Sequence, residues 1–232
     1  RQFNQVSHWG DYDTSTLSKG AGIWSRSEKS IKPSQTACRS LDIEHKSYTP
    51  DELIQALLQS PVDLLWNGGI GTYVKGENES HEQVGDRANE SLRVNGNQLR
   101  CKVIGEGGNL GMTQLARIEY SLNGGRCNTD SIDNAGGVDS SDHEVNIKIL
   151  LNAKVESEDL TAKQRNQLLS KMTDDVADLV LENNYRQTLA ISLAENRRAK
   201  HHHDYLRFLE HLEETGRLHR DLEFLPDNET IK

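Results

Sequence analysis

Two short apolar segments, each followed by a glycine-rich run, restrict the folds open to this chain. Residues 62–66 (VDLLW) lead into NGGIG at 67–71, and residues 99–104 (LRCKVI) lead into GEGGN at 105–109. Apolar runs of this length are typical of strands buried in a parallel sheet. Residues 113–122 then show the 3.6-residue period of a helix. Strand, glycine loop and helix in this order predict an α/β fold whose parallel strands deliver both loops to one sheet edge.

The glycines of these loops have two interpretations. A backbone without side chains can approach a ribose or pyrophosphate closely and offer its N–H groups as donors. The same residues also make tight strand-to-helix turns. No G-x-G-x-x-G follows a strand in this chain, so the usual dinucleotide fingerprint is absent. The spacing alone leaves open whether the loops are structural turns or the edge of a nucleotide-binding sheet.

Helical signals dominate much of the remaining chain. Thr49, Pro50 and Glu52 stand where an N-cap, a first helical residue and a capping-box partner belong, which predicts a helix to about residue 59. We also expect helices over 86–93, 141–151 and 161–183, with more helix up to a cap at Gly216 and only irregular structure over residues 1–48. We therefore expect residues 1–150 to form a partial Rossmann-like domain and residues 151–232 an all-helical region.

Charge and cysteine content exclude several classes of protein. With 27 Lys and Arg against 36 Asp and Glu, the net charge is −9, which disfavours a nucleic-acid partner. No apolar run approaches the roughly 18 residues of a membrane span, and the first residues lack the pattern of a signal peptide. Three cysteines, Cys38, Cys101 and Cys127, match no disulfide or zinc spacing. We expect a soluble cytoplasmic protein with reduced thiols and no membrane partner.

Three longer stretches carry a more specific signal. Residues 63–74 (DLLWNGGIGTYV), 103–115 (VIGEGGNLGMTQL) and 134–149 (NAGGVDSSDHEVNIKI) resemble the large bacterial NAD-specific glutamate dehydrogenases. The resemblance also reaches WGDYD at 9–13 and EFLP at 223–226, so it covers nearly the whole chain. More distantly, two of the stretches resemble the glutamate, leucine, phenylalanine and valine dehydrogenase superfamily.

This resemblance implies an NAD site. The E-G-A-N loop of the superfamily is similar to residues 106–109, with Gly108 in place of Ala, and implies that Asn109 meets the cofactor ribose. The N-A-G-G-V stretch is similar to residues 134–138 and implies that Asn134 contacts the nicotinamide end. The choice of NAD over NADP rests on the resemblance alone. The expected cofactor-binding residues are Gly68, Gly69, Gly107, Gly108, Asn109 and Asn134.

Ser141 has both a functional and a structural interpretation. In the resembled glutamate enzymes, the serine at this place binds the side-chain carboxylate of the substrate. Here Asp142 and His143 replace the usual aromatic pair, although Glu144 is kept. Ser-x-x-Glu at the start of a helix is also a capping box, with Ser141 as the N-cap. Both can hold together, because a helix N-terminus attracts anions.

The resemblance implies oxidative deamination of L-glutamate to 2-oxoglutarate and ammonia by a homo-oligomer. It also implies that the catalytic Lys and Asp and the glycine fingerprint precede residue 1, among the remaining domains of the same chain. We therefore expect no catalytic residue in this sequence and no activity from it alone. Two alternatives stay open: a dehydrogenase for another amino acid, and a non-catalytic regulatory or assembly module that docks through residues 150–232.

Other conspicuous side chains have structural interpretations. Three consecutive histidines, 201–203, point about 100° apart on a helix and cannot all face one ion, so we expect a solvated surface and no metal site. Trp9, Trp24 and Trp66 are expected in core or interdomain packing rather than against a cofactor. The apolar stripe from residue 168 to residue 180 is expected to be ordinary core.

Overall fold

The chain divides into two compact units in a computed structural model that describes residues 8–11, 13–225 and 227–231. Unit 1 comprises Arg1–Gly105 and Leu110–Cys127, and unit 2 comprises Glu106–Asn109 and Asn128–Lys232. The boundary that we expected at residue 150 falls inside helix α6 (Ala135–Glu156). The division into a cofactor-binding domain and a helical region stays a prediction.

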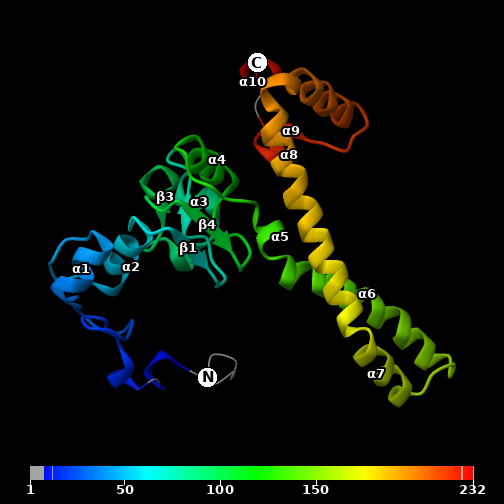
Figure 1. Cartoon of the computed structure of the whole chain (residues 1–232), viewed down its shortest axis with the longest axis horizontal. Coiled ribbons are helices and arrows are strands. Elements are labelled where there is room, and N and C mark those ends of the chain that lie inside the picture. Colours follow the sequence, from blue (N-terminus) through cyan, green and yellow to red (C-terminus); the bar gives the residue numbers. More distant parts are fainter. Residues whose placement is uncertain (1–7, 12, 226, 232) are drawn as a thin grey trace. The chain divides into compact units, whose positions relative to one another are not determined.

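Unit 1 combines short strands with helices, which confirms the α/β class (Figure 1). Strand β1 pairs with β4, and β2 pairs in parallel with β3, with Val74 opposite Val94. The last residue of β4 belongs to unit 2. The elements are η1 (Trp9–Asp11), η2 (Thr14–Thr16), α1 (Gln35–Leu41), α2 (Pro50–Leu58), β1 (Leu64–Asn67), β2 (Val74–Lys75), α3 (His81–Val84), η3 (Arg87–Asn89), β3 (Val94–Asn95), η4 (Gly96–Gln98), β4 (Val103–Glu106) and α4 (Gln114–Leu122).

Local capping signals in the sequence place two of these helices correctly. Thr49 and Glu52 form the reciprocal capping box at the start of α2, with Pro50 as its first residue. Thr113 accepts the Ala116 N–H at the start of α4. The chain leaves α4 through Gly124, which adopts φ +89°, a conformation that favours glycine.

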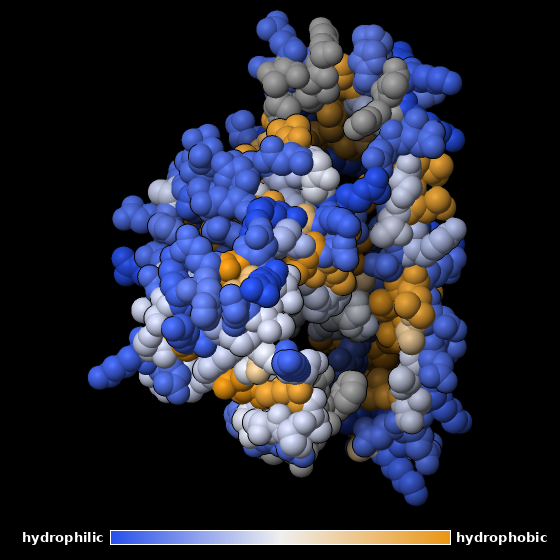
Figure 2. Space-filling view, turned by 60° about the vertical axis from the view of Figure 1, so that its left-hand side comes forward, coloured by the Kyte–Doolittle hydropathy of each residue, from blue (hydrophilic) through white to orange (hydrophobic). Residues whose placement is uncertain are grey.

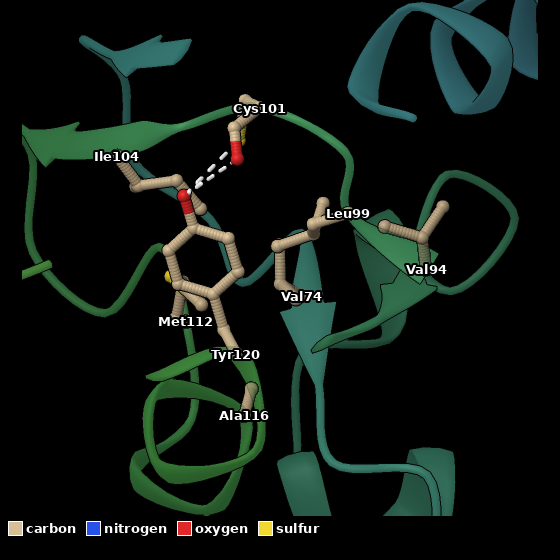
Figure 3. Packing of buried hydrophobic residues seen from close by; sticks show 8 residues of the cluster. All are labelled: Val74, Val94, Leu99, Cys101, Ile104, Met112, Ala116 and Tyr120. Atoms are coloured by element: carbon tan, nitrogen blue, oxygen red, sulfur yellow. Dashed lines mark hydrogen bonds between the residues drawn. The ribbon is translucent and has the colours of Figure 1, made fainter. Parts of the chain in front are cut away.

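The main core of unit 1 forms around Tyr120 of α4. Figure 3 shows its ring in the middle of the cluster, with the hydroxyl directed at Cys101. Leu122, at the end of α4, is 83% exposed and takes no part in this core. Ala116 and Tyr120, one turn apart, are buried because η4 approaches their face of α4, and a Cβ on Gly96 would lie 2.8 Å from the Ala116 carbonyl oxygen. The buried members are Val74, Val94, Leu99, Cys101, Ile104, Met112, Ala116 and Tyr120.

Four expectations for unit 1 are wrong. The α-helix expected over 86–93 is not formed, and the short 3-10 helix η3 (Arg87–Asn89) is the helical element there. Helix α1, capped by Ser34, lies in the stretch expected to be irregular. The second strand begins only at Val103. The burial expected for β1 is also wrong, since its side chains alternate between exposed and half-buried.

Unit 2 is helical after its first loop. Its helices are α5 (Asp130–Asp133), α6 (Ala135–Glu156), α7 (Ala162–Lys171), α8 (Thr173–Glu214), α9 (Arg220–Glu223) and α10 (Asn228–Ile231). The single helix expected over 161–183 is divided at Met172, which ends α7 and begins α8. The long helix α8 has a non-helical residue at His201. Gly216 follows it with φ +67°, as its predicted capping role requires.

Much apolar surface on both units is exposed. Val180 of the predicted core stripe is buried, but Leu168 and Leu179 are 39% and 51% exposed, so this stripe is only partly core. Trp9, Trp24 and Trp66 are also exposed, and the expectation that they pack in the core of this chain is wrong. Figure 2 shows hydrophobic residues as orange patches on the face in view. None of the helices among the described residues is long and apolar enough to cross a membrane.

Candidate functional site

The loop after β4 meets the start of α6 through two asparagine side chains. Nδ2 of Asn134 donates a hydrogen bond of 2.6 Å to Oδ1 of Asn109. Both residues belong to unit 2, although 25 positions separate them in the sequence. The fold therefore brings together the two asparagines that the resemblance connects with a cofactor. Gly107 and Gly108 lie in the same short loop.

Asp133 anchors the loop that follows β4 through hydrogen bonds of its carboxylate, and the sequence reasoning missed this role. Its Oδ2 accepts the backbone N–H of Glu106 at 3.0 Å, and its Oδ1 accepts Nδ2 of Asn128 at 3.0 Å. Asn184 of α8 donates to the carbonyl oxygen of Ile132 at 2.6 Å and so ties α5 to α8. The available signal was the position of Asp133, an acceptor directly before the Asn-Ala-Gly-Gly run.

Asn134 uses its side chain for Asn109 rather than for its own helix. It is the N-cap of α6 with φ −97° and ψ 23°, and its side chain makes no capping bond. A Cβ on Gly137 would lie 2.6 Å from Oδ1 of Asn134, whereas a Cβ on Gly136 would meet nothing within 4 Å. Glycine at 137 thus gives the Asn134 amide its space, and glycine at 136 leaves open space beside the helix N-terminus.

Ser141 lies within α6 and does not begin it. The predicted capping box is wrong, because α6 starts at Ala135 and Glu144 instead forms an ion pair with Lys148 on the next turn. Ser141 is exposed. It follows Asn134 by seven residues, so the two point in similar directions about 10 Å apart along the helix axis. Ser141 therefore stands on the face of α6 that continues from Asn134.

Gly68 and Gly69 belong to unit 1, whereas the other four cofactor candidates belong to unit 2. Both are exposed in the loop that follows β1. A Cβ on Gly69 would meet nothing within 4 Å. The nearby Gly71 differs, because it adopts φ +134° and a Cβ there would lie 2.6 Å from Nδ2 of Asn89. The loop thus contains one glycine with open space and one that the fold requires.

The histidine run at 201–203 lies at the surface, whereas the cysteines are buried or half-buried. His201 and His203 are exposed, and Nδ1 of His201 lies 2.9 Å from Oδ2 of Asp204. Among the residues that the structure describes, no group of three or more His, Cys, Asp or Glu side chains is arranged to hold a metal ion. Cys38, Cys101 and Cys127 are thiols, as expected.

Sequence comparison decides the family to which this arrangement belongs. The model of the family described as bacterial NAD-glutamate dehydrogenase, catalytic domain, matches residues 1–194. The chain belongs to this family. The resemblance expected from the three motif stretches is thereby confirmed, and all seven expected site residues lie within the part that matches the bacterial NAD-glutamate dehydrogenase family.

Curated relatives of this family extend the similarity over almost the whole chain. The NAD-specific glutamate dehydrogenase of Pseudomonas aeruginosa is 59% identical over 225 residues, and that of Halomonas elongata is 53% identical over 225 residues. The enzyme of the same name from Mycobacterium tuberculosis is 47% identical over 231 residues. Each match covers 97% of this chain and 14% of the relative, so the chain spans about one seventh of the length of these proteins.

Proposed function

We propose that this chain supplies part of the cofactor site of an NAD-dependent glutamate dehydrogenase. The reaction is the oxidative deamination of L-glutamate to 2-oxoglutarate and ammonia, carried out by a longer protein of which this chain is one part. The hydrogen bond between Asn134 and Asn109 carries the proposal, because it joins the two motif residues that the family resemblance assigns to the cofactor. Family membership and the names of the curated relatives support it.

The residues present fit a pyridine nucleotide. A carboxamide offers two donor hydrogens and an acceptor oxygen, and the Asn134–Asn109 bond uses one hydrogen of the first residue and one lone pair of the second. The remaining groups match ribose hydroxyls and the nicotinamide carboxamide, which both donate and accept. Open space beside Gly136 lets a ligand approach the backbone at the start of α6.

Each candidate residue has a defined task in this proposal. Asn109 binds the ribose, and Asn134 binds and orients the nicotinamide end. Gly68, Gly69, Gly107 and Gly108 allow close backbone contact at the edge of a Rossmann-like sheet. Ser141 binds the side-chain carboxylate of glutamate. Bound NAD⁺ supplies the hydride acceptor, and the residues of this chain hold it in orientation rather than carry out proton transfer.

Activity of the longer protein tests these assignments. Glutamate-dependent formation of NADH is measured for wild type, Asn109→Ala and Ser141→Ala, with Ser140→Ala as a matched control on the neighbouring position. We expect Asn109→Ala to raise the KM for NAD⁺ and Ser141→Ala to raise the KM for glutamate, with kcat changed less. Unchanged constants in an active wild type would remove both residues from the site. Trials with leucine, valine and phenylalanine separate glutamate from other substrates.

The isolated chain is proposed to be inactive. No G-x-G-x-x-G follows a strand in this sequence, and the resemblance assigns the catalytic lysine and aspartate to another part of the longer protein. Purified 232-residue protein should form no NADH from glutamate under conditions in which the longer protein does. Sustained turnover would show that the catalytic groups are present here. The homo-oligomeric state and the cytoplasmic location stay predictions.

A second candidate function is an assembly module, which the exposed apolar side chains of α8 favour. Leu181, Tyr185 and Leu189 follow one another at four-residue intervals and are 68%, 65% and 41% exposed. Substitution of all three by Ser would weaken subunit or domain association under this hypothesis, with unchanged KM for NAD⁺. The cofactor-site proposal predicts the reverse for Asn109→Ala, which should raise the KM for NAD⁺ and leave subunit or domain association unchanged.

A further inference from the structure

A buried arginine in unit 1 holds the chain just after the glycine loop of β1. The side chain of Arg93 has no exposed surface. Its Nε donates to the carbonyl oxygen of Thr72 at 2.9 Å, its Nη2 donates to that of Asp86 at 2.5 Å, and its Nη1 lies 2.8 Å from Nδ1 of His81. Because a guanidinium only donates, Nδ1 of His81 is the acceptor. The fork of one arginine thus connects three separate segments.

Asp86 binds the backbone N–H of Thr72, the residue whose carbonyl oxygen accepts from Arg93. Its Oδ2 accepts the backbone N–H of Thr72 at 2.9 Å and Nδ2 of Asn89 at 2.7 Å. These hydrogen bonds, the Thr72 bond first, lower the pKa of the Asp86 carboxyl from its ordinary value, with a smaller contribution from the nearby Arg93. Both backbone groups of Thr72 are therefore bound to charged side chains, and Thr72 itself is buried.

This arrangement fixes one end of the loop, and β1 fixes the other. The loop spans residues 68–71, between the last residue of β1 and Thr72. Gly71 packs so closely on Asn89 that no Cβ fits there, and the Tyr73 hydroxyl donates to the Ile70 carbonyl oxygen at 3.0 Å. A four-residue loop fixed at both ends has few alternative paths. The exposed backbone of Gly68 and Gly69 is thereby held in one conformation.

We propose that Arg93 is a positioning residue for the cofactor, which it never touches, by holding Thr72 and hence the Gly68–Gly69 backbone in binding geometry. The inference rests on the proposed function, since it assumes that these two glycines contact NAD. Lysine cannot replace arginine in this role, because a compact ammonium group cannot reach all three acceptors in the planar fork geometry. The charge is kept in that variant, so the test isolates the geometry.

The test uses the full-length protein with Arg93→Lys, Arg100→Lys and Asn109→Ala. Arg100 is a matched control in the same unit, because it also donates to backbone carbonyl oxygens, those of Gln59 and Asp42, but far from the loop in sequence. We expect Arg93→Lys to raise the KM for NAD⁺ about tenfold, the scale of one lost charge-assisted hydrogen bond, and to leave kcat and the KM for glutamate within about twofold. Hydrogen exchange at the Thr72 amide should become faster. Arg100→Lys should change none of these quantities.

The outcomes separate the inference from the proposed function. Faster exchange at Thr72 with an unchanged KM for NAD⁺ would make Arg93 purely structural and overturn the inference. A lower kcat together with higher KM values for both NAD⁺ and glutamate and lower thermal stability would overturn it too, since that pattern indicates general unfolding. If Asn109→Ala raises the KM for NAD⁺ and Arg93→Lys does not, the proposed function stands and only the inference fails. If neither variant changes it, both fail.

Discussion

Asn134 and Asn109 contact each other through their side-chain amides, with 2.6 Å between the donor nitrogen and the acceptor oxygen. The contact joins the N-cap of α6 to the loop that follows β4. Each amide restrains the rotation of the other, so the orientation of one amide depends on its partner. A nucleotide that bonds to both would find them already aligned, which lowers the entropy lost on binding.

This dependence predicts non-additive kinetics. Asn109→Ala and Asn134→Ala should each raise the KM for NAD⁺ about tenfold, because either change removes one ligand bond and releases the other amide. The double variant should raise KM by clearly less than the product of the two single effects. Asn78→Ala, at an exposed turn, serves as a control that should leave KM unchanged. Multiplicative effects would mean that the two amides act independently.

Asp133 should matter for cofactor binding although it lies behind the asparagine pair. Asp133→Asn leaves only one side-chain oxygen for two donors, the Glu106 N–H and the Asn128 amide. We expect a roughly threefold to tenfold rise in the KM for NAD⁺ and faster hydrogen exchange at the Glu106 amide. Asp178→Asn, on the exposed surface of α8, is the matched control. Normal exchange at Glu106 would show that Asp133 does not fasten the loop.

The hydroxyl of Tyr120 should stabilise the core of unit 1. It donates to the Cys101 carbonyl oxygen at 3.0 Å, so Tyr120→Phe leaves a buried acceptor unsatisfied and should cost about 1 to 2 kcal/mol. Burial is the main cause that raises the pKa of Tyr120 above its ordinary value. An unfolded tyrosine ionises near pH ~10, so this residue contributes stability below that pH which is lost as pH rises above it.

Hydrogen exchange of the α4 amides in the full-length protein measures both effects. Local unfolding free energy is compared for wild type and Tyr120→Phe at neutral and alkaline pH. The wild type should lose more stability than the variant on going above pH ~10. Tyr73→Phe, which removes a hydroxyl bond near the surface, is the control. An equal decrease of the local unfolding free energy at alkaline pH in wild type and Tyr120→Phe would contradict the burial argument.

Two glycines of one loop should respond differently to alanine. Gly71→Ala should destabilise unit 1 by about 2 kcal/mol, because φ +134° is strained for a side chain and its Cβ would meet Asn89. Gly69→Ala should leave stability unchanged, since its Cβ meets nothing within 4 Å, and should raise the KM for NAD⁺ if a ligand occupies that space. Thermal unfolding and steady-state kinetics separate the two responses. A Gly69 variant with normal kinetics removes this glycine from the site.

Elements defined by short-range signals could be predicted from the sequence. The capping box at Thr49 and the glycine after α8 each act within one helical turn, so neighbouring residues suffice to identify them. The family, too, could be recognised from three motif stretches. Predictions that depended on distant partners failed more often. The helix expected over 86–93 is absent, because Arg93 is directed into bonds with Thr72 and Asp86 rather than along a helix surface.

The sequence by itself determined the α/β class, the helical second half and the residue types available to a cofactor, because composition and periodicity are properties of neighbours along the chain. Only the tertiary structure decided that Asn134 reaches Asn109, that Asp133 fastens their loop and that Ser141 lies inside α6 instead of capping it. The physical reason is that a side chain with several donors and acceptors has many local partners of similar energy. Packing of segments distant in sequence selects one of them.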